Sequence, residues 1–186
     1  MKNFTYILLA AILTTTLFTA CSKTDTKEPS GNNDSGNTTS ITTTMIMDAI
    51  KEAYGENYLP NSEIPTELLE SEFGLTSDMY EEVKAEQPMI GTHADRVVVV
   101  KAAQGKAEDV EAAFNTAKDN KINDTLQYPM NLPKINAGKI VRNGDFVCFL
   151  LVGAINDNVD LSEEEAKQFA EDEVAKGVNA VNKLFK

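Results

Sequence analysis

The chain has no tryptophan, a single histidine and two cysteines among its 186 residues. A histidine-based metal site or a Ser-His-Asp triad would therefore have to be built around His93. No Gly-x-Ser-x-Gly nucleophile elbow occurs. Paired glutamates can hydrolyse glycosides, but here no tryptophan is present to line a sugar cleft. We interpret His93 as a turn or strand-end residue, and we expect no enzymatic activity and no cofactor or metal ion.

The scarcity of cysteine also limits the covalent chemistry of the chain. The two cysteines are Cys21 and Cys148, and we expect lipid to consume the thiol of Cys21. No intrachain disulfide is then possible in the mature protein. Cys148 lies within the apolar run 146–152, which predicts a buried structural thiol rather than a nucleophile.

The first twenty-one residues have the pattern of a lipoprotein signal. A lysine at position 2 precedes a short apolar run, and the small residues Thr19 and Ala20 stand directly before Cys21. The run is too short to span a bilayer and ends like a cleavage site. We therefore predict a signal peptide at 1–20 and acyl chains such as palmitate attached at Cys21. An ordinary secretory signal followed by a chance cysteine is the alternative.

This prediction implies a cellular location and a membrane partner for the protein. A lipid on Cys21 would hold it at the cell membrane, on the outer, extracytoplasmic face of the cell envelope. The formal net charge is -12, which should repel nucleic acid and anionic headgroups. We expect no nucleic-acid partner. The acidic surface is interpreted as serving solubility, with recognition of a basic ligand as the alternative.

The mature sequence divides into a tether and one domain. Residues 21–41 are rich in Ser, Thr, Asn and Gly and have almost nothing to bury, so they predict the lipidated cysteine and a flexible tether. Residues 42–186 predict a single α+β domain. Its expected helices cover 46–54, 65–73, 77–87, 107–117 and 163–185, and its expected strands cover 97–100, 135–141 and 146–152.

The strongest local pattern is Asn143-Gly144 between two apolar runs. It predicts a two-residue hairpin turn with Val141 opposite Phe146. The second strand of the hairpin is apolar throughout and is expected at the centre, whereas the first is mixed and is expected at an edge. The fold class that we predict is α+β, with a small three-stranded antiparallel sheet in the order first-third-second and about five helices.

One apolar-aromatic loop is not required by this fold. Tyr128, Pro129 and Met130 lie in a stretch stiffened by prolines, and tyrosine offers a flat amphipathic surface. We interpret this loop as packed beneath the sheet. The alternative is a binding surface formed by this loop together with Tyr58 and Leu59.

Several phrases of the sequence resemble the DUF4358 family, a domain of unknown function found in small lipoproteins of mostly Gram-positive anaerobes. The phrases are residues 54–61, 79–90, 99–102, 126–131 and 144–147, and the resemblance covers about residues 45–155. It implies a surface lipoprotein on the outer face of a single membrane. It implies no activity and no functional residue, because the family has none assigned.

These observations lead to one functional expectation with two alternatives. We expect a non-catalytic binding or interaction module that recognises an unidentified protein or small-molecule ligand. The first alternative is an accessory or substrate-presenting subunit of a cell-envelope complex, and the second is a hydrolase. A cleft with converging carboxylates would favour the hydrolase, and an exposed apolar patch without such groups would favour the binding module.

Overall fold

The computed structural model describes residues 40–186 with the exception of 157 and 159. Its five α-helices are α1 (Thr43–Tyr54), α2 (Thr66–Phe73), α3 (Ala107–Asn123), α4 (Leu132–Ala137) and α5 (Glu163–Leu184). Its strands are β1 (Ser62–Glu63), β2 (Tyr80–Gln87), β3 (Arg96–Ala102), β4 (Lys139–Asn143) and β5 (Phe146–Leu151). Two short 3-10 turns, η1 (Gly55–Asn57) and η2 (Pro129–Asn131), precede β1 and α4.

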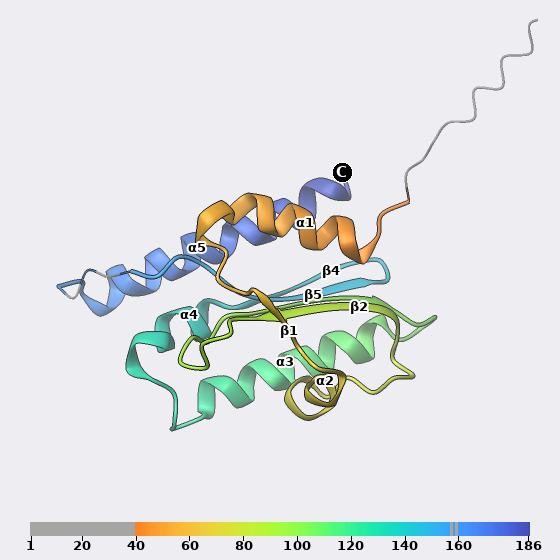
Figure 1. The fold of residues 1–186 in the computed structure, drawn as a ribbon, viewed down its shortest axis with the longest axis horizontal. Coiled ribbons are helices and arrows are strands. Elements are labelled where there is room, and N and C mark those ends of the chain that lie inside the picture. The colour runs from red at the N-terminus through yellow and green to blue at the C-terminus, as the bar shows by residue number, and fades with distance from the viewer. Residues whose placement is uncertain (1–39, 157, 159) are drawn as a thin grey trace, which may run out of the picture. The chain divides into compact units, whose positions relative to one another are not determined.

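The described residues form a three-layer structure in which helices cover both faces of one sheet (Figure 1). The sheet has the order β1-β2-β3-β5-β4, and every neighbouring pair is antiparallel. Helices α1 and α5 lie side by side on one face, and α2 and α3 cover the other. Helix α4 leads into the edge strand β4 and contacts α5.

Strand β3 shows why both faces need cover. Val97 and Val99 pack with the buried side chains of α1 and α5, and Val98 and Val100 pack with those of α2 and α3. Successive side chains of a strand point to opposite faces, so four consecutive buried valines require two separate cores. The run is therefore covered on both faces of the sheet.

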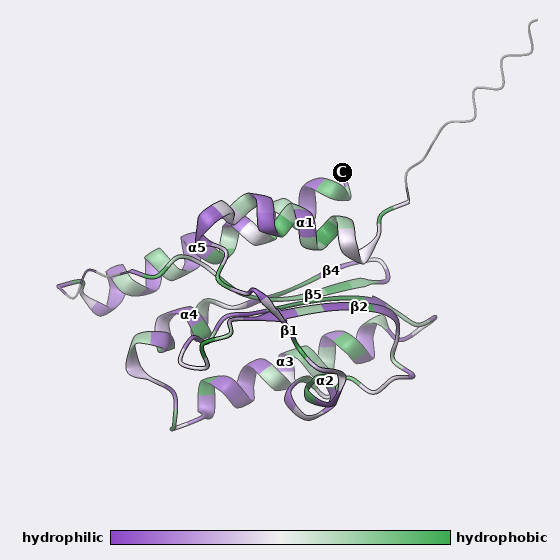
Figure 2. Cartoon of the chain, in the orientation of Figure 1, coloured by the Kyte–Doolittle hydropathy of each residue, from purple (hydrophilic) through white to green (hydrophobic). Residues whose placement is uncertain are grey.

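Strand β5 is equally apolar and lies beside β3, with β4 at the edge. The relative order that the sequence predicts for these three strands is therefore confirmed. Cys148 on β5 is fully buried. Figure 2 shows the hydrophobic colour along β5 and the hydrophilic colour over much of β2.

The prediction of a three-stranded sheet is wrong, because the sheet has five strands. The chief error is β2, which we predicted as a helix at 77–87 from the start at Ser77, the spacing of Met79 and Val83, and the stop before Pro88. Val83 and Ala85 of β2 pack into the core on the α2 side, while Glu82 and Glu86 reach α1 on the opposite face. Pairing along the buried strand β3 overrides the helical propensity of these residues.

The first strand of the hairpin is also displaced from its predicted range of 135–141. Residues Leu132–Ala137 form α4, with Pro133 in its first turn, and β4 begins at Lys139. Proline is compatible with a helix start, and two residues of α4, Ile135 and Ala137, are buried on separate sides of the helix. These contacts favour a short helix over an extended segment.

The hairpin exists, but its register differs from the prediction by two residues. Asn143 pairs with Phe146, so Gly144 and Asp145 form the two-residue turn. Gly144 has φ +60° at the first turn position, as primed turns require. Asn143 remains in the strand, where its Nδ2 donates to Asn182 Oδ1 of α5 at 3.1 Å. Because the shift is two residues, the side chains keep their predicted faces.

The last helix begins as predicted. Ser162 accepts a hydrogen bond from the backbone N–H of Glu165, and the Glu165 carboxylate accepts one from the backbone N–H of Ser162. This reciprocal capping box satisfies two backbone donors and fixes where α5 leaves the preceding loop.

Candidate functional site

The loops of this fold gather at the two ends of the sheet. One end, which we call the loop end, comprises residues 58–61, 88–95, 124–132 and 152–156, which lie where β2 and β5 finish and β3 begins. The other, the hairpin end, contains the β4–β5 turn and the start of α1. The two ends differ in the side chains that they expose.

Large apolar side chains are exposed mainly at the loop end. Leu126 is 88% exposed, Met130 84% and Tyr128 54%. Four further large apolar residues at this end are exposed: Met89, Ile90, Leu132 and Ile155. Single exposed apolar residues need no explanation, but a group of them on neighbouring loops marks a candidate interaction surface. We call these seven residues the apolar rim.

Tyr128 and Met130, from the predicted loop that also contains Pro129, belong to this rim. Pro129 opens η2, and Asn131 at its end donates from Nδ2 to the carbonyl oxygen of Thr92 at 2.9 Å. The Asp124 carboxylate accepts the backbone N–H of Leu126 at 2.9 Å. The loop is therefore fastened to the β2–β3 loop while its apolar side chains face outward.

The structure places Tyr58 and Leu59 differently. Both are only half-buried, and the Tyr58 hydroxyl donates to Glu86 Oε2 at 3.0 Å. Burial, followed by the neighbouring Glu86 charge, raises the pKa of Tyr58 well above its usual value. Tyr58 thus joins α1 to β2, and the segment borders the rim through Asn61, whose Oδ1 accepts the backbone N–H of Met89 at 3.1 Å.

A buried ion pair supports the rim from below. Asp95 is 1% exposed, and both of its carboxylate oxygens accept from Lys134 Nζ at 3.0 Å. Lys134 also donates to the carbonyl oxygen of Gly153 at 2.9 Å, and the Gly153 N–H donates to Asp95 at 3.3 Å. Two loops and a helix are thereby tied at one point, because Asp95 precedes β3, Gly153 follows β5 and Lys134 lies in α4.

The same segment after β5 is held from the α5 side. Glu173 of α5 accepts the backbone N–H of Ala154 at 3.0 Å. The Tyr54 hydroxyl donates to the Glu173 carbonyl oxygen at 2.9 Å and accepts the Gly177 N–H at 3.1 Å. A Cβ on Gly153 would come within 2.7 Å of the Glu173 Cβ. This close approach leaves no room for a larger residue at position 153. We call the linked residues Asp95, Lys134, Gly153 and Glu173 the frame behind the rim.

A cavity of about 170 Å³ opens beside the rim. Its lining includes His93, Tyr128 and the cationic side chains of Arg96 and Lys121. Arg96 Nε lies 2.9 Å, and Lys121 Nζ 2.5 Å, from the same oxygen of Glu72. Sequence reasoning missed this cluster, because the three residues belong to β3, α3 and α2 and no motif links them.

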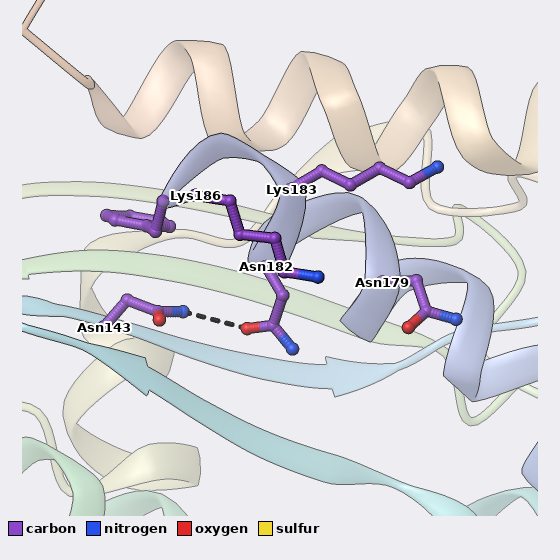
Figure 3. A pocket seen from close by; sticks show the side chains of 6 residues that line it. Asn143, Asn179, Asn182, Lys183 and Lys186 are labelled. Carbon is purple, nitrogen blue, oxygen red and sulfur yellow. Dashed lines mark hydrogen bonds between the residues drawn. The ribbon is translucent and has the colours of Figure 1, made fainter.

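A larger hollow of about 380 Å³ lies at the hairpin end, against the last turns of α5 (Figure 3). Its lining consists of Asn143, Asn179, Asn182, Lys183, Phe185 and Lys186. Two of its amides bond to each other, and Phe185 packs on Phe146 with ring centres 5.7 Å apart. The six described residues that line it supply no carboxylate, imidazole or thiol for catalysis.

Within the described part of the chain, no group of three or more His, Cys, Asp or Glu residues is arranged to hold a metal ion. None of the described helices combines the length and the apolar character that crossing a membrane requires. The predicted signal peptide at 1–20, the lipid site Cys21 and the tether up to residue 39 lie outside the described residues.

A comparison with models of known families shows to which family this chain belongs. The model of the domain of unknown function DUF4358 matches residues 53–152, which is more than half of the sequence. The chain belongs to the DUF4358 family. The DUF4358 match contains all five strands, α2 to α4 and most of the loop end, whereas α5 and nearly all of α1 lie outside it. No curated protein and no solved structure matches the chain.

Proposed function

We propose that this DUF4358 protein is a non-catalytic binding module that recognises a partner through its loop end. The observation that carries the proposal is the apolar rim, which exposes large side chains on loops held by the frame. Exposing such side chains to water is unfavourable unless another surface covers them. A preformed frame also reduces the ordering entropy that binding must offset.

The surroundings of His93 support binding over catalysis. A hydrolytic site requires a nucleophile within hydrogen-bond reach of a base, and a third group that orients the base. Among the described residues, the His93 imidazole makes no hydrogen bond with a Ser, Cys, Asp or Glu side chain, and only its backbone N–H is bonded, to Ile90. Cys148, whose thiol could otherwise act as a nucleophile, is buried on β5.

We further propose that the module is displayed outside the membrane by a lipid on Cys21. The support is the pattern of the first twenty-one residues, an apolar run that ends in small residues before cysteine. The polar composition of 22–41 suits a tether, whose root-mean-square reach would be roughly 25 Å.

The proposal is tested by capturing partners of the full chain from its own membrane and comparing variants. Leu126→Ser and Tyr128→Ala remove rim side chains that contact no core cluster, so they should reduce capture more than fivefold, corresponding to more than about 1 kcal/mol of binding energy. Leu68→Ser is the matched control, because Leu68 is an exposed leucine of α2 that belongs neither to the rim nor to the lining of the cavity. It should leave capture unchanged.

His93→Ala separates binding from catalysis in the same assay. A non-catalytic module should retain its cellular effect in this variant. Loss of that effect in a folded and abundant protein would contradict the proposal, as would equal capture by the Leu126→Ser and Leu68→Ser variants.

A further inference from the structure

The cavity beside the rim carries a net positive charge within a strongly acidic protein. Arg96 and Lys121 line it, each with a side chain only 17% exposed. Both cations share one oxygen of Glu72, so two positive charges meet one negative charge and leave a net charge of +1. The chain as a whole has a net charge of -12. A local reversal of charge in a concave, partly desolvated site attracts anions.

The neighbouring carboxylates do not cancel this excess. Asp95 accepts both of its short side-chain contacts from Lys134, and only its backbone carbonyl reaches Arg96, at 2.8 Å from Nη1. Asp124 bonds to neutral donors, the Leu126 N–H and the Gln127 side-chain amide, so it keeps its charge, but it does not line the cavity and forms no ion pair with Arg96 or Lys121. The charged side chains that line the cavity are therefore the two cations.

The size and surroundings of the cavity narrow the class of anion. A space of about 170 Å³ suits one small group rather than a whole metabolite, given that ordinary ligand pockets measure about 300–1,000 Å³. A carboxylate brings one negative charge, which balances the excess, whereas a phosphate monoester brings about -1.5 to -2. Tyr128 belongs both to the cavity lining and to the apolar rim, and Leu126 does so as well.

We infer that the cavity binds the carboxylate of an acidic side chain on a partner protein, while apolar residues flanking that side chain pack on the rim. The inference rests on the proposed binding function of the loop end and specifies the chemistry of the partner. Arg96 and Lys121 supply the charge, and Glu72 holds the two cations in position. Charge-assisted hydrogen bonds of this kind are shorter and stronger than neutral ones.

The test immobilises the full-length chain in detergent and measures the binding of two soluble peptides by surface plasmon resonance. The first is N-acetyl-Ala-Leu-Glu-Leu-Ala-amide, and the second has Gln in place of Glu. The Glu peptide should bind about tenfold more tightly, because only its side chain meets the cavity charge. The difference should shrink as salt is raised, since partly exposed charges are screened.

Substitutions then assign the effect to the cavity. Lys121→Met should reduce binding of the Glu peptide to the level of the Gln peptide, and Glu72→Gln should strengthen it severalfold by raising the net charge of the cavity to +2. Lys106→Met is the matched control, because it removes a lysine near the start of the same helix, at the hairpin end. It should leave the preference for Glu unchanged.

Three outcomes would overturn the inference: equal binding of the two peptides, an equal loss of binding in Lys106→Met and Lys121→Met, or inorganic phosphate displacing the Glu peptide at lower concentration than acetate does. The same experiments test the proposed function independently of the carboxylate assignment.

If membrane capture depends on Leu126 while the two peptides bind alike, the rim binds partners and the carboxylate assignment is wrong. If the peptides are discriminated but capture ignores Leu126, the binding module as proposed is wrong.

Discussion

Asp95 is the residue on which the loop end depends most. Its carboxylate is buried and is held by Lys134 and by the Gly153 N–H. Burying a charge is unfavourable unless an opposite charge pairs with it. Removing one partner of a buried ion pair therefore destabilises a protein by more than the whole pair contributes to its stability. The Asp95 charge is therefore compensated by a single lysine, which lies in a six-residue helix.

We predict that Lys134→Met destabilises the protein by about 3–5 kcal/mol, because it leaves the Asp95 carboxylate buried without its cation. Urea unfolding followed by circular dichroism measures the change. Lys106→Met removes an exposed lysine paired with Asp109 and should leave the unfolding midpoint nearly unchanged. A Lys134→Met protein as stable as the parent would mean that Asp95 is solvated or otherwise paired.

Cys148 allows a prediction about reactivity and alkaline pH. Burial raises the pKa of its thiol from 9.0 to about 12. The unfolded state loses this proton near pH 9 and the folded state only near pH 12, so above pH 9 the folded state binds more protons. The free energy of unfolding should therefore fall as pH rises from 9 to 12.

The measurement uses Cys21→Ser, so that Cys148 is the one thiol left. A thiol reagent at pH 8 should react with it slowly in native protein and completely in denaturant. Replacing Cys148 with Ala should flatten part of the alkaline fall in stability. Rapid labelling of the native protein would contradict the placement of this side chain in the core.

At the scale of elements, the hairpin shows how a correct local pattern can give an incorrect register. Asn-Gly predicts a primed turn, but two registers place Gly144 at a position that tolerates positive φ. The contact of Asn143 with Asn182 and the 2.7 Å ion pair between Arg142 and Glu111 select between them. Both partners are distant in sequence, so no local pattern could have revealed the choice.

The turn itself should be sensitive to substitution. Gly144→Val places a β-branched residue at φ +60°, which should cost more than about 1 kcal/mol of unfolding free energy in thermal or urea denaturation. Gly91→Val is the matched control, because a Cβ there meets nothing within 4 Å and its backbone is not left-handed. Equal effects of the two substitutions would argue against a strained turn at Gly144.

Strand β2 shows that helix propensity alone can predict the wrong secondary structure. Most of its residues are good helix formers, and Met79 and Val83, four residues apart, have helical spacing. Val83 and Ala85, two residues apart, fit a strand instead. The deciding interactions are the ladder with β3 and polar contacts to α1, such as Lys51 Nζ to Glu86 Oε1 at 2.6 Å. By contrast, β3, β5 and α5 were predictable, because an unbroken apolar run or a capping box has few alternatives.

At the scale of the whole molecule, the candidate site was only partly predictable. Tyr128 and Met130 stood out because apolar residues in a proline-rich loop have no obvious place in the core. The cluster of Arg96, Lys121 and Glu72 gave no signal, since charged residues on helices and strand ends ordinarily face solvent. These three residues meet only because α2 and α3 pack against each other on the same face of the sheet, next to the start of β3.

The anchoring proposal makes its own prediction for the whole chain. Cys21→Ser removes the thiol that accepts lipid, so the protein should leave the membrane fraction or accumulate as uncleaved precursor. Fractionation of cells followed by intact-mass measurement detects both results. Processed, membrane-bound protein in this variant would disprove lipid attachment at Cys21, whereas Cys148→Ser should change neither processing nor location.

Helix α1 gives the molecule a direction. It starts at Thr43, which bonds to Glu82 near the hairpin end, and it finishes at Tyr54, which bonds to the segment after β5 at the loop end. An anchor upstream of α1 would therefore pull on the hairpin end, and the eight residues of β2 alone set the two ends about 25 Å apart. If the proposed lipid on Cys21 holds the chain at a bilayer, this polarity would leave the rim at the end of the domain opposite the attachment, free to meet a partner away from the lipid surface.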